Sequence, residues 1–387
     1  MKLKNILSKI KLLLRLLFFV KKTFSSPEEK KIVLFDCESP EQLGNLLPKK
    51  KMFILTTRTI KIKELYINFD LIKFMLLNFY KQSFKINYLI FLIKKINPKV
   101  VITWIDNSTE FYLISKELKK QIKFIAIQQA SRETEWLPIK WTKKIHIPEY
   151  YCFGDFDKKI YLKKTQVEKI QSKGSLKAAC ALTYIKKNKI KIKNDFDICL
   201  VSEINPTDRK YVYDKKNKWK RNQTNVRDLD HVPNFNYSSS KIAKYVYMFA
   251  DKYNLKVAIA GKGEKNSEDR KKEFKFYENA VGRKNLNLRP RNEKTFSNYQ
   301  LMLKSKIVIG MRSTMAREAI GYNLKTFFCN FTDHANGDYP FCKKMKNLYL
   351  VHPNNHSYDL FEKKLYYILK LSNKKYFELL GNIKNEI

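Results

Sequence analysis

The stretch that decides the fold is SKIVIGMRSTMAREAIGYNLKTFFCNF, residues 305–331. The apolar run Ile307–Ile309 predicts a buried strand that ends at Gly310, and Ser313 is a typical first cap of a following helix. A second apolar run, 326–330, predicts the next strand. Strand, turn, helix and strand in this order are typical of a βαβ unit in a parallel sheet.

The turn before this helix also has the composition of an anion site. The first N–H groups of a helix have no partner within it, and the helix dipole favours negative charge there. Arg312 and Arg317 flank the turn with a charge that suits phosphate. Glu318 follows Thr314 by one helical turn, where a carboxylate would reach ribose hydroxyls. The pattern predicts a phosphate seat at Arg312, Ser313 and Thr314, but an ordinary βαβ unit with a capped helix fits it equally well.

Length and composition bound the class of protein. The chain has 387 residues, of which 44% are hydrophobic and 14% aromatic, so two or three folded domains are expected and a disordered chain is excluded. Its six cysteines form no CxxC pair and no metal-ligand spacing with histidine. We expect free thiols in a reducing compartment, with neither a zinc site nor a disulfide framework.

The formal net charge of +41 allows three interpretations. The basic residues are dispersed along the chain, so a lysine-rich composition over solvated surfaces explains most of the charge. Attraction to an anionic membrane surface explains part of it. Nucleic-acid binding ranks third, because the chain has no zinc-finger spacing, RNP-like aromatic motif or compact basic helix.

Residues 1–20, MKLKNILSKIKLLLRLLFFV, carry apolar side chains at helical spacing with lysines on the other side. No uncharged apolar run exceeds five residues, which argues against a membrane span and against a signal peptide. The pattern predicts a basic amphipathic helix over residues 1–24 in the cytoplasmic membrane interface. A helix packed on its own domain is the open alternative.

Beyond this segment, short apolar runs alternate with helical patterns, which predicts an α/β fold with parallel sheets. The basic stretch 186–195 has little core potential and is expected to be a linker. We therefore expect two Rossmann-like domains facing a cleft, at 25–185 and 196–372, and a C-terminal helix at 373–387. The expected strands are 32–35, 52–56, 100–104, 124–128 and 151–153, then 197–201, 256–260, 285–288, 307–309, 326–330 and 348–351. The expected helices are 71–96 and 111–120, then 239–253, 269–278, 297–304, 358–371 and 374–383.

Candidate functional residues follow from the rule that ligands bind beyond the carboxyl ends of strands in open α/β sheets. In the first domain these positions give catalytic candidates, and in the second they give nucleotide-binding candidates. The candidates are Asp106, Gln129 and Arg132 in the first domain, and Ser202, Glu203, Gly261 and Lys262 in the second. Each residue also has a structural interpretation as a helix cap or a plain turn. The GKGE sequence at 261–264 lacks the spacing of known phosphate-binding loops.

His334, in the sequence DHANGDYP, follows the strand after the opening stretch and is the remaining catalytic candidate, for acid–base chemistry. A flexible polar loop explains the same sequence equally well. GxSxG and HExxH motifs are absent, so hydrolases of those kinds are not supported. No DxD-like pair stands out. We therefore expect a metal-independent reaction without a bound cofactor.

Several motifs together resemble one family. They are WIDNSTEFYLISK, KFIAIQQASR, YYCFGDFDKKIY with the later KGSLK, DICLVSEI, NLKVAIAGKG with EFKFYENA, and SNYQLMLKSKIVIGMRSTMAREAIG, within residues 32–345. The chain resembles bacterial surface-carbohydrate (capsule or lipopolysaccharide) biosynthesis transferases of the GT-B fold. The resemblance implies a glycosyltransferase at the cytoplasmic membrane face, with a nucleotide-sugar donor in the second domain. It implies a lipid-linked or oligosaccharide acceptor on the side of Asp106, Gln129 and Arg132.

One position departs from the family pattern. Similar proteins commonly carry Gln-Asn-Gly or Gln-His-Gly where this chain has Gln129-Ala130-Ser131. Loss of that glycine stiffens a turn that approaches the ligand closely, which bears on the acceptor assignment and on activity. A polyol-phosphate transferase, a sugar-nucleotide epimerase of the same fold, and a basic membrane- or nucleic-acid-binding protein stay open as alternatives. The motifs do not identify the donor sugar, the acceptor or the stereochemical outcome.

Overall fold

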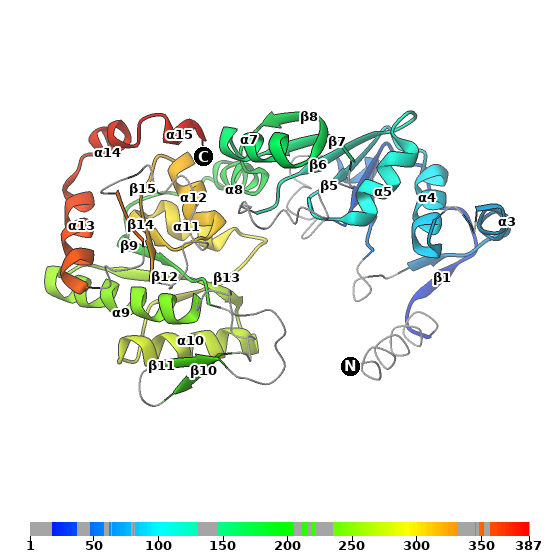
Figure 1. The fold of residues 1–387 in the computed structure, drawn as a ribbon. Coiled ribbons are helices and arrows are strands. Elements are labelled where there is room, and N and C mark those ends of the chain that lie inside the picture. Colours follow the sequence, from blue (N-terminus) through cyan, green and yellow to red (C-terminus); the bar gives the residue numbers. More distant parts are fainter. Residues whose placement is uncertain are drawn as a thin grey trace. The chain divides into compact units, whose positions relative to one another are not determined.

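A computed structural model describes the chain over residues 18–36, 47–57, 62, 64–78, 80, 82–130, 146–204, 211–214, 218–221, 235–331, 345, 348–351 and 357–386. The chain forms two compact units. Unit 1 comprises residues 1–129, 138–152 and 158–176, and unit 2 comprises residues 130–137, 153–157 and 177–387. Each unit contains a six-stranded parallel sheet, and Figure 1 shows the elements of both. The α/β fold class predicted from the sequence is confirmed.

The sheet of unit 1 has the strand order β3-β2-β5-β6-β7-β8. Its strands are β2 (Ile32–Phe35), β3 (Met52–Leu55), β5 (Val100–Thr103), β6 (Lys123–Ile127), β7 (His146–Cys152) and β8 (Gln166–Ser172). The chain adds β3 on one side of β2 and all later strands on the other, so the order reverses between β2 and β5. Strand β8 was not predicted from the sequence, because its mostly exposed or half-exposed side chains form no apolar run. The short parallel pair β1 (Lys21–Thr23) and β4 (Glu64–Tyr66) was not predicted either.

The helices of unit 1 are α3 (Phe69–Asn78), α4 (Phe84–Ile96) and α5 (Thr109–Leu118), and α7 (Asp155–Lys164) begins in unit 2 and continues in unit 1. The single helix predicted over 71–96 is wrong, because two helices, α3 and α4, occupy this range. The break has a local cause, because the Ser83 side chain caps α4 by accepting from the backbone N–H of Ile86. The buried face of α4 covers the core.

The sheet of unit 2 has the order β13-β12-β9-β14-β15-β16. Its strands are β9 (Phe196–Val201), β12 (Val257–Glu264), β13 (Leu288–Arg291), β14 (Ser305–Gly310), β15 (Lys325–Asn330) and β16 (Tyr349–Val351). In sequence order this is 3-2-1-4-5-6, the arrangement of dinucleotide-binding Rossmann sheets. The order reverses between β9 and β14, which pair directly. A hairpin of β10 (Tyr211–Asp214) and β11 (Lys218–Arg221) was not predicted.

Helices cover both faces of this sheet, with α9 (Phe235–Tyr253) and α10 (Glu268–Val281) on one face and α11 (Ser297–Leu303) and α12 (Thr314–Gly321) on the other (Figure 1). The remaining helices are α8 (Leu176–Lys187), α13 (Tyr358–Lys370), α14 (Asn373–Leu380) and α15 (Ile383–Glu386). The strands β14 and β15 are buried along nearly their whole length, which explains their strong apolar signal.

Two further predictions concern the cysteines and the membrane. Among the residues that the structure describes, Cys152, Cys180, Cys199 and Cys329 are buried and form no disulfide. The predicted amphipathic helix at residues 1–24 lies largely outside the described part of the chain. Its last residues are described, and there the prediction is wrong, because Lys21–Thr23 form the strand β1. Within that part, no helix has the length and apolar character needed to cross a bilayer.

Candidate functional site

The candidate site lies where the strand order of unit 2 reverses. Open α/β sheets bind ligands at such a point, beyond the carboxyl ends of the two strands. Here the strands are β9, followed by Ser202 and Glu203, and β14, which ends at Gly310. The opening stretch of the sequence and the DICLVSEI motif therefore meet at one edge of one sheet.

The Glu203 carboxylate accepts hydrogen bonds from the first turn after β14. Its Oε1 lies 2.5 Å from the backbone nitrogen of Met311, and its Oε2 lies 2.8 Å from that of Arg312. Burial raises the pKa of Glu203, although the N–H groups of Met311, Arg312 and Ser313 oppose that rise. We predicted that backbone N–H groups of this turn would point outward unpaired. Those of Met311 and Arg312 instead bind an anionic group of the chain itself.

Local geometry explains why the chain can turn so tightly here. A Cβ atom on Gly310 would lie 2.7 Å from the Ala316 side chain and 3.2 Å from Glu203 Oε1, so only glycine fits without a shift. Ser313 then caps α12, its side chain accepting from the backbone N–H of Met315 at 3.2 Å. The side chains of Arg312, Ser313 and Thr314 are all half-buried at this edge. The two interpretations of this sequence, a capped helix and an anion seat, therefore concern the same turn and do not exclude each other.

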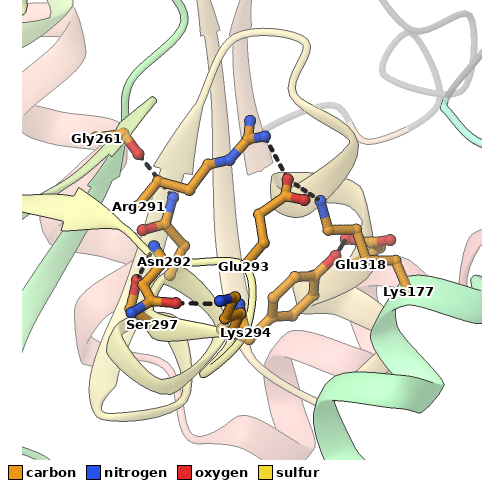
Figure 2. Close-up of polar contacts among 10 residues, drawn as sticks. Lys177, Gly261, Arg291, Asn292, Glu293, Lys294, Ser297 and Glu318 are labelled. Carbon is orange, nitrogen blue, oxygen red and sulfur yellow. Dashed lines mark hydrogen bonds and ion pairs between the residues drawn. The ribbon is translucent and has the colours of Figure 1, made fainter. Parts of the chain in front are cut away.

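The two charged residues farther along α12 are buried. Arg317 is 1% exposed and forms a two-bond ion pair with the buried carboxylate of Asp157, also in unit 2. The expectation that Arg317 contributes charge to the phosphate seat is therefore wrong, because its guanidinium is committed to Asp157. Glu318 accepts a 2.7 Å hydrogen bond from the Tyr299 hydroxyl, which fixes the orientation of its carboxylate (Figure 2). A contact of Glu318 with ribose remains a prediction.

The GKGE sequence forms the end of β12, and its backbone is hydrogen-bonded to Glu273 of α10. The Glu273 carboxylate is fully buried and accepts from the backbone N–H groups of Lys262 (2.9 Å) and Gly263 (3.0 Å), and from the Ser202 hydroxyl. A Cβ atom on Gly261 would lie 2.7 Å from a backbone oxygen of β13. Ser202 and Gly261 therefore have structural partners, while their predicted ligand contacts stay predictions.

Lys262 is exposed, and its ammonium donates a 3.0 Å hydrogen bond to the carbonyl oxygen of Ile204, directly after Glu203. This contact places a lysine charge beside the Glu203 turn. Arg312 and Lys262 thus supply basic side chains from two strands of one sheet edge. Arg and Lys side chains form strong charge-assisted hydrogen bonds to phosphate.

The loop between β13 and α11 lies at the same edge and is rigidly held (Figure 2). Glu293 forms ion pairs with Arg291 and with Lys177 of α8, the latter at 3.4 Å. The Asn298 side chain of α11 donates to the carbonyl oxygen of Gly261 at 2.8 Å, which links the start of α11 to β12. These bonds give the edge a fixed shape beside the switch point.

Unit 1 presents its own candidates at the ends of β5 and β6. Asp106 is 1% exposed, and its carboxylate accepts from the hydroxyls of Tyr150 (2.8 Å) and Tyr161 (3.2 Å) and from the backbone N–H of Gln129 at 3.4 Å. These contacts bring two predicted catalytic residues together, in a setting typical of a structural acid. Arg132 and His334 lie outside the described residues. The catalytic roles of all four remain predictions.

Three residues with a structural role at this edge were not predicted from the sequence: Glu273, Tyr299 and Asp157. Glu273 and Tyr277 lie one helical turn apart in α10, and both are buried. A carboxylate on the apolar face of this helix is the sequence signal from which Glu273 could have been predicted. Asp157 gave no signal, because its partner Arg317 is far away in the sequence. Among the described residues, no group of three or more His, Cys, Asp or Glu side chains is arranged to hold a metal.

Comparison with known proteins gives matches in structure alone. No model of a known protein family matches the chain, and no curated protein does. The structure is similar to that of MnaA from S. aureus, solved with UDP, at a TM-score of 0.52 and 12% identity over 92% of this chain and 91% of that one. It is also similar to the UDP-GlcNAc 2-epimerase of Neisseria meningitidis bound to UDP-GlcNAc, at a TM-score of 0.50 and 12% identity over 91% and 94% of the two chains.

At this level of identity the likeness concerns the fold. It covers nearly the whole chain, both units included. The chain therefore has the GT-B-like architecture of two Rossmann-like domains that its sequence predicted.

Proposed function

We propose that the chain is a sugar-nucleotide enzyme in which unit 2 binds the phosphates of a nucleotide-activated sugar. One observation carries the proposal. At the switch point of a Rossmann-ordered sheet, the N–H groups of Met311 and Arg312 already bind a carboxylate, so this turn has the geometry of an anion seat. The fold likeness to two UDP-sugar proteins supports the same substrate class.

The donor phosphates would bind next to Glu203, contacted by the side chains of Arg312 and Lys262. The Ser313 hydroxyl accepts one hydrogen bond from Met315 and can donate another to a phosphate oxygen. Charge that develops on the departing phosphate would be stabilised by these fixed donors. Glu318, oriented by Tyr299, would contact the ribose.

For the reaction we propose glycosyl transfer to a lipid-linked or oligosaccharide acceptor in surface-polysaccharide or lipopolysaccharide synthesis, without a metal. Epimerisation of the sugar nucleotide is the second candidate, and the likeness to a 2-epimerase favours it. Incubation with a labelled donor distinguishes the two. Label in a larger acceptor product supports transfer, whereas label in an epimerised sugar, either still attached to its nucleotide or released from it by water, contradicts it.

The nucleotide site is tested by thermal shift with a panel of UDP-, GDP-, CMP- and CDP-sugars. We expect stabilisation by one nucleotide class. Arg312→Ala should weaken binding about ten- to hundredfold, because a charged hydrogen bond contributes about 1.5–3 kcal/mol. Arg283→Ala, which removes an exposed arginine paired with Asp251, is the control and should bind as the wild type does.

Glu203→Gln gives a second and opposite test. The Glu203 carboxylate would be a like charge beside the phosphates, and removal of a like charge at about 4 Å is worth roughly 1 kcal/mol. We expect about fivefold tighter nucleotide binding. If Arg312→Ala leaves the thermal shift unchanged and Glu203→Gln does not increase it, the phosphates bind elsewhere.

A further inference from the structure

Helix α3 of unit 1 is apolar on two opposite faces, which is unusual for a helix at a protein surface. One face packs inward: Leu71 is buried, and the Phe74 ring lies 5.6 Å from the ring of Phe91 in α4. The opposite face carries Phe69, Ile72, Leu76 and Leu77, exposed by 77%, 51%, 69% and 62%. Packing within the described residues accounts for the first face and leaves the second uncovered.

The exposed apolar residues continue on both sides of α3. Tyr80 and Phe84, at the turn into α4, are 71% and 74% exposed. The strand β4, which leads into α3, pairs with β1, and β1 is flanked by exposed Phe18, Phe19 and Phe24. We call the outward residues of α3 with Tyr80 and Phe84 the α3 face. An exposed apolar face of this kind marks an interaction surface.

Lysines lie on the α3 face and beside helix α3. Lys73 lies among its apolar residues in the same helix and is exposed. Lys94 of α4 is exposed and lies 5.7 Å from the centre of the Phe74 ring, which places it beside α3. The acidic residue of the helix, Asp70, is paired with Lys95. Lys73 therefore puts positive charge within the α3 face, in a chain whose net charge is +41.

We propose that the α3 face is a membrane-docking surface that inserts its aromatic and leucine side chains into an anionic bilayer. Apolar side chains that enter the headgroup boundary and lysines that attract anionic lipids are the two contributions that hold peripheral proteins on membranes. The exposed Lys73 within the face and the net charge of +41 favour an anionic lipid surface over a second copy of this chain, since two such basic chains would repel each other. The surface deepens the proposed function, because it would bring the enzyme to a lipid-linked acceptor, but vesicle binding does not depend on nucleotide binding.

The test is flotation of the full chain with vesicles of phosphatidylcholine alone and of phosphatidylcholine with phosphatidylglycerol. We expect binding to the anionic vesicles, weakened by salt. The double variant Phe69→Ser, Leu76→Ser should reduce that binding at least tenfold. Both side chains are largely exposed, so the fold should persist, as checked by circular dichroism and the thermal midpoint.

The matched control is Leu162→Ser, Leu379→Ser, which removes two exposed leucines from other helices, 54% and 43% exposed, and should bind as the wild type does. Absence of wild-type binding to either kind of vesicle overturns the proposal. So does unchanged binding by the α3 variant, which would assign the membrane contact to the N-terminal segment. Loss of a concentration-dependent dimer in the α3 variant, without vesicle binding by the wild type, would assign the face to a second copy. Nucleotide-induced thermal shifts are measured on the same variants, so failure of either proposal is recognised separately.

Discussion

The two units place buried carboxylates at the ends of their sheets but satisfy them in different ways. In unit 1, Asp106 accepts from the hydroxyls of Tyr150 and Tyr161, and Asp36 accepts from the backbone and the hydroxyl of Thr57. In unit 2, Glu203 and Glu273 accept mainly from backbone N–H groups of turns. When such an acid is removed, the buried side-chain hydroxyls that donated to it lose their acceptor. Backbone N–H groups at a turn before a helix can instead bind another anion. The contrast separates structural acids from an acid that occupies a candidate ligand position.

The largest expected effect is in unit 1. Asp106→Ala leaves two buried tyrosine hydroxyls without their acceptor, which should cost about 2–4 kcal/mol of unfolding free energy. Glu203→Ala in unit 2 should cost less than about 1 kcal/mol, since water or phosphate can replace the carboxylate. Urea unfolding followed by circular dichroism measures both. Asp106→Asn keeps an acceptor oxygen and is the control. Equal losses for the two alanine variants would remove the contrast.

The second prediction concerns the close packing beneath Glu203. Gly310→Ala brings a methyl group to 2.7 Å from Ala316 and should destabilise by about 1–3 kcal/mol. Gly321→Ala, at the other end of α12, meets no atom within 4 Å and should be neutral or stabilising by up to about 1 kcal/mol. Thermal denaturation of the pair checks the expectation. A neutral Gly310→Ala would mean that the turn after β14 adjusts freely.

Helix caps of the two units give a matched pair of smaller effects. Ser108 caps α5 after β5, and Ser313 caps α12 after β14. Replacement of either by alanine should cost about 1 kcal/mol of stability. Only Ser313→Ala should also weaken the thermal shift by nucleotide sugars. If Ser108→Ala weakens it equally, the effect reflects general destabilisation and the role of Ser313 in binding is contradicted.

The smallest effect is a pH dependence. Folding raises the pKa of Glu203 above its usual 4.5, mainly through burial, so the folded state holds its proton more tightly than the unfolded state. The stability contribution of Glu203 therefore falls as pH rises from about 4.5 through the raised value. Glu203→Gln lacks this titration. The difference in thermal midpoint, variant minus wild type, should therefore increase as pH rises across that window and stay constant at higher pH.

The control for this measurement is Glu268→Gln. The Glu268 pKa is lowered by its hydrogen bond with Lys271, so its contribution to stability is present above about 4.5 and is lost as pH falls. The midpoint difference between this variant and wild type should have the opposite sign of pH dependence. A flat profile for Glu203→Gln would show that the carboxyl is not desolvated by folding.

Much of the fold followed from the sequence because its signals are local. The apolar runs at β2, β9, β14 and β15 were placed within two residues, since strands buried on both faces have continuous hydrophobic sequences. The edge strand β8 and the break between α3 and α4 were missed. An edge strand has little apolar pattern, and the capped start of α4 lies within a continuous amphipathic sequence.

By itself, the sequence determined the α/β class, most strands of the two sheets, and the Gly310-to-Ser313 turn that starts α12. The expected strands 151–153 and 285–288 overlap only the ends of β7 and β13, and β8 was not predicted. Tertiary structure decided that Glu203 binds that turn and that Arg317 turns inward to Asp157. It also decided that one apolar face of α3 is uncovered. The physical reason is the range of the interactions. Strand and cap preferences are set by neighbouring residues, whereas the partner of a carboxylate or guanidinium depends on which strand ends the sheet order brings together.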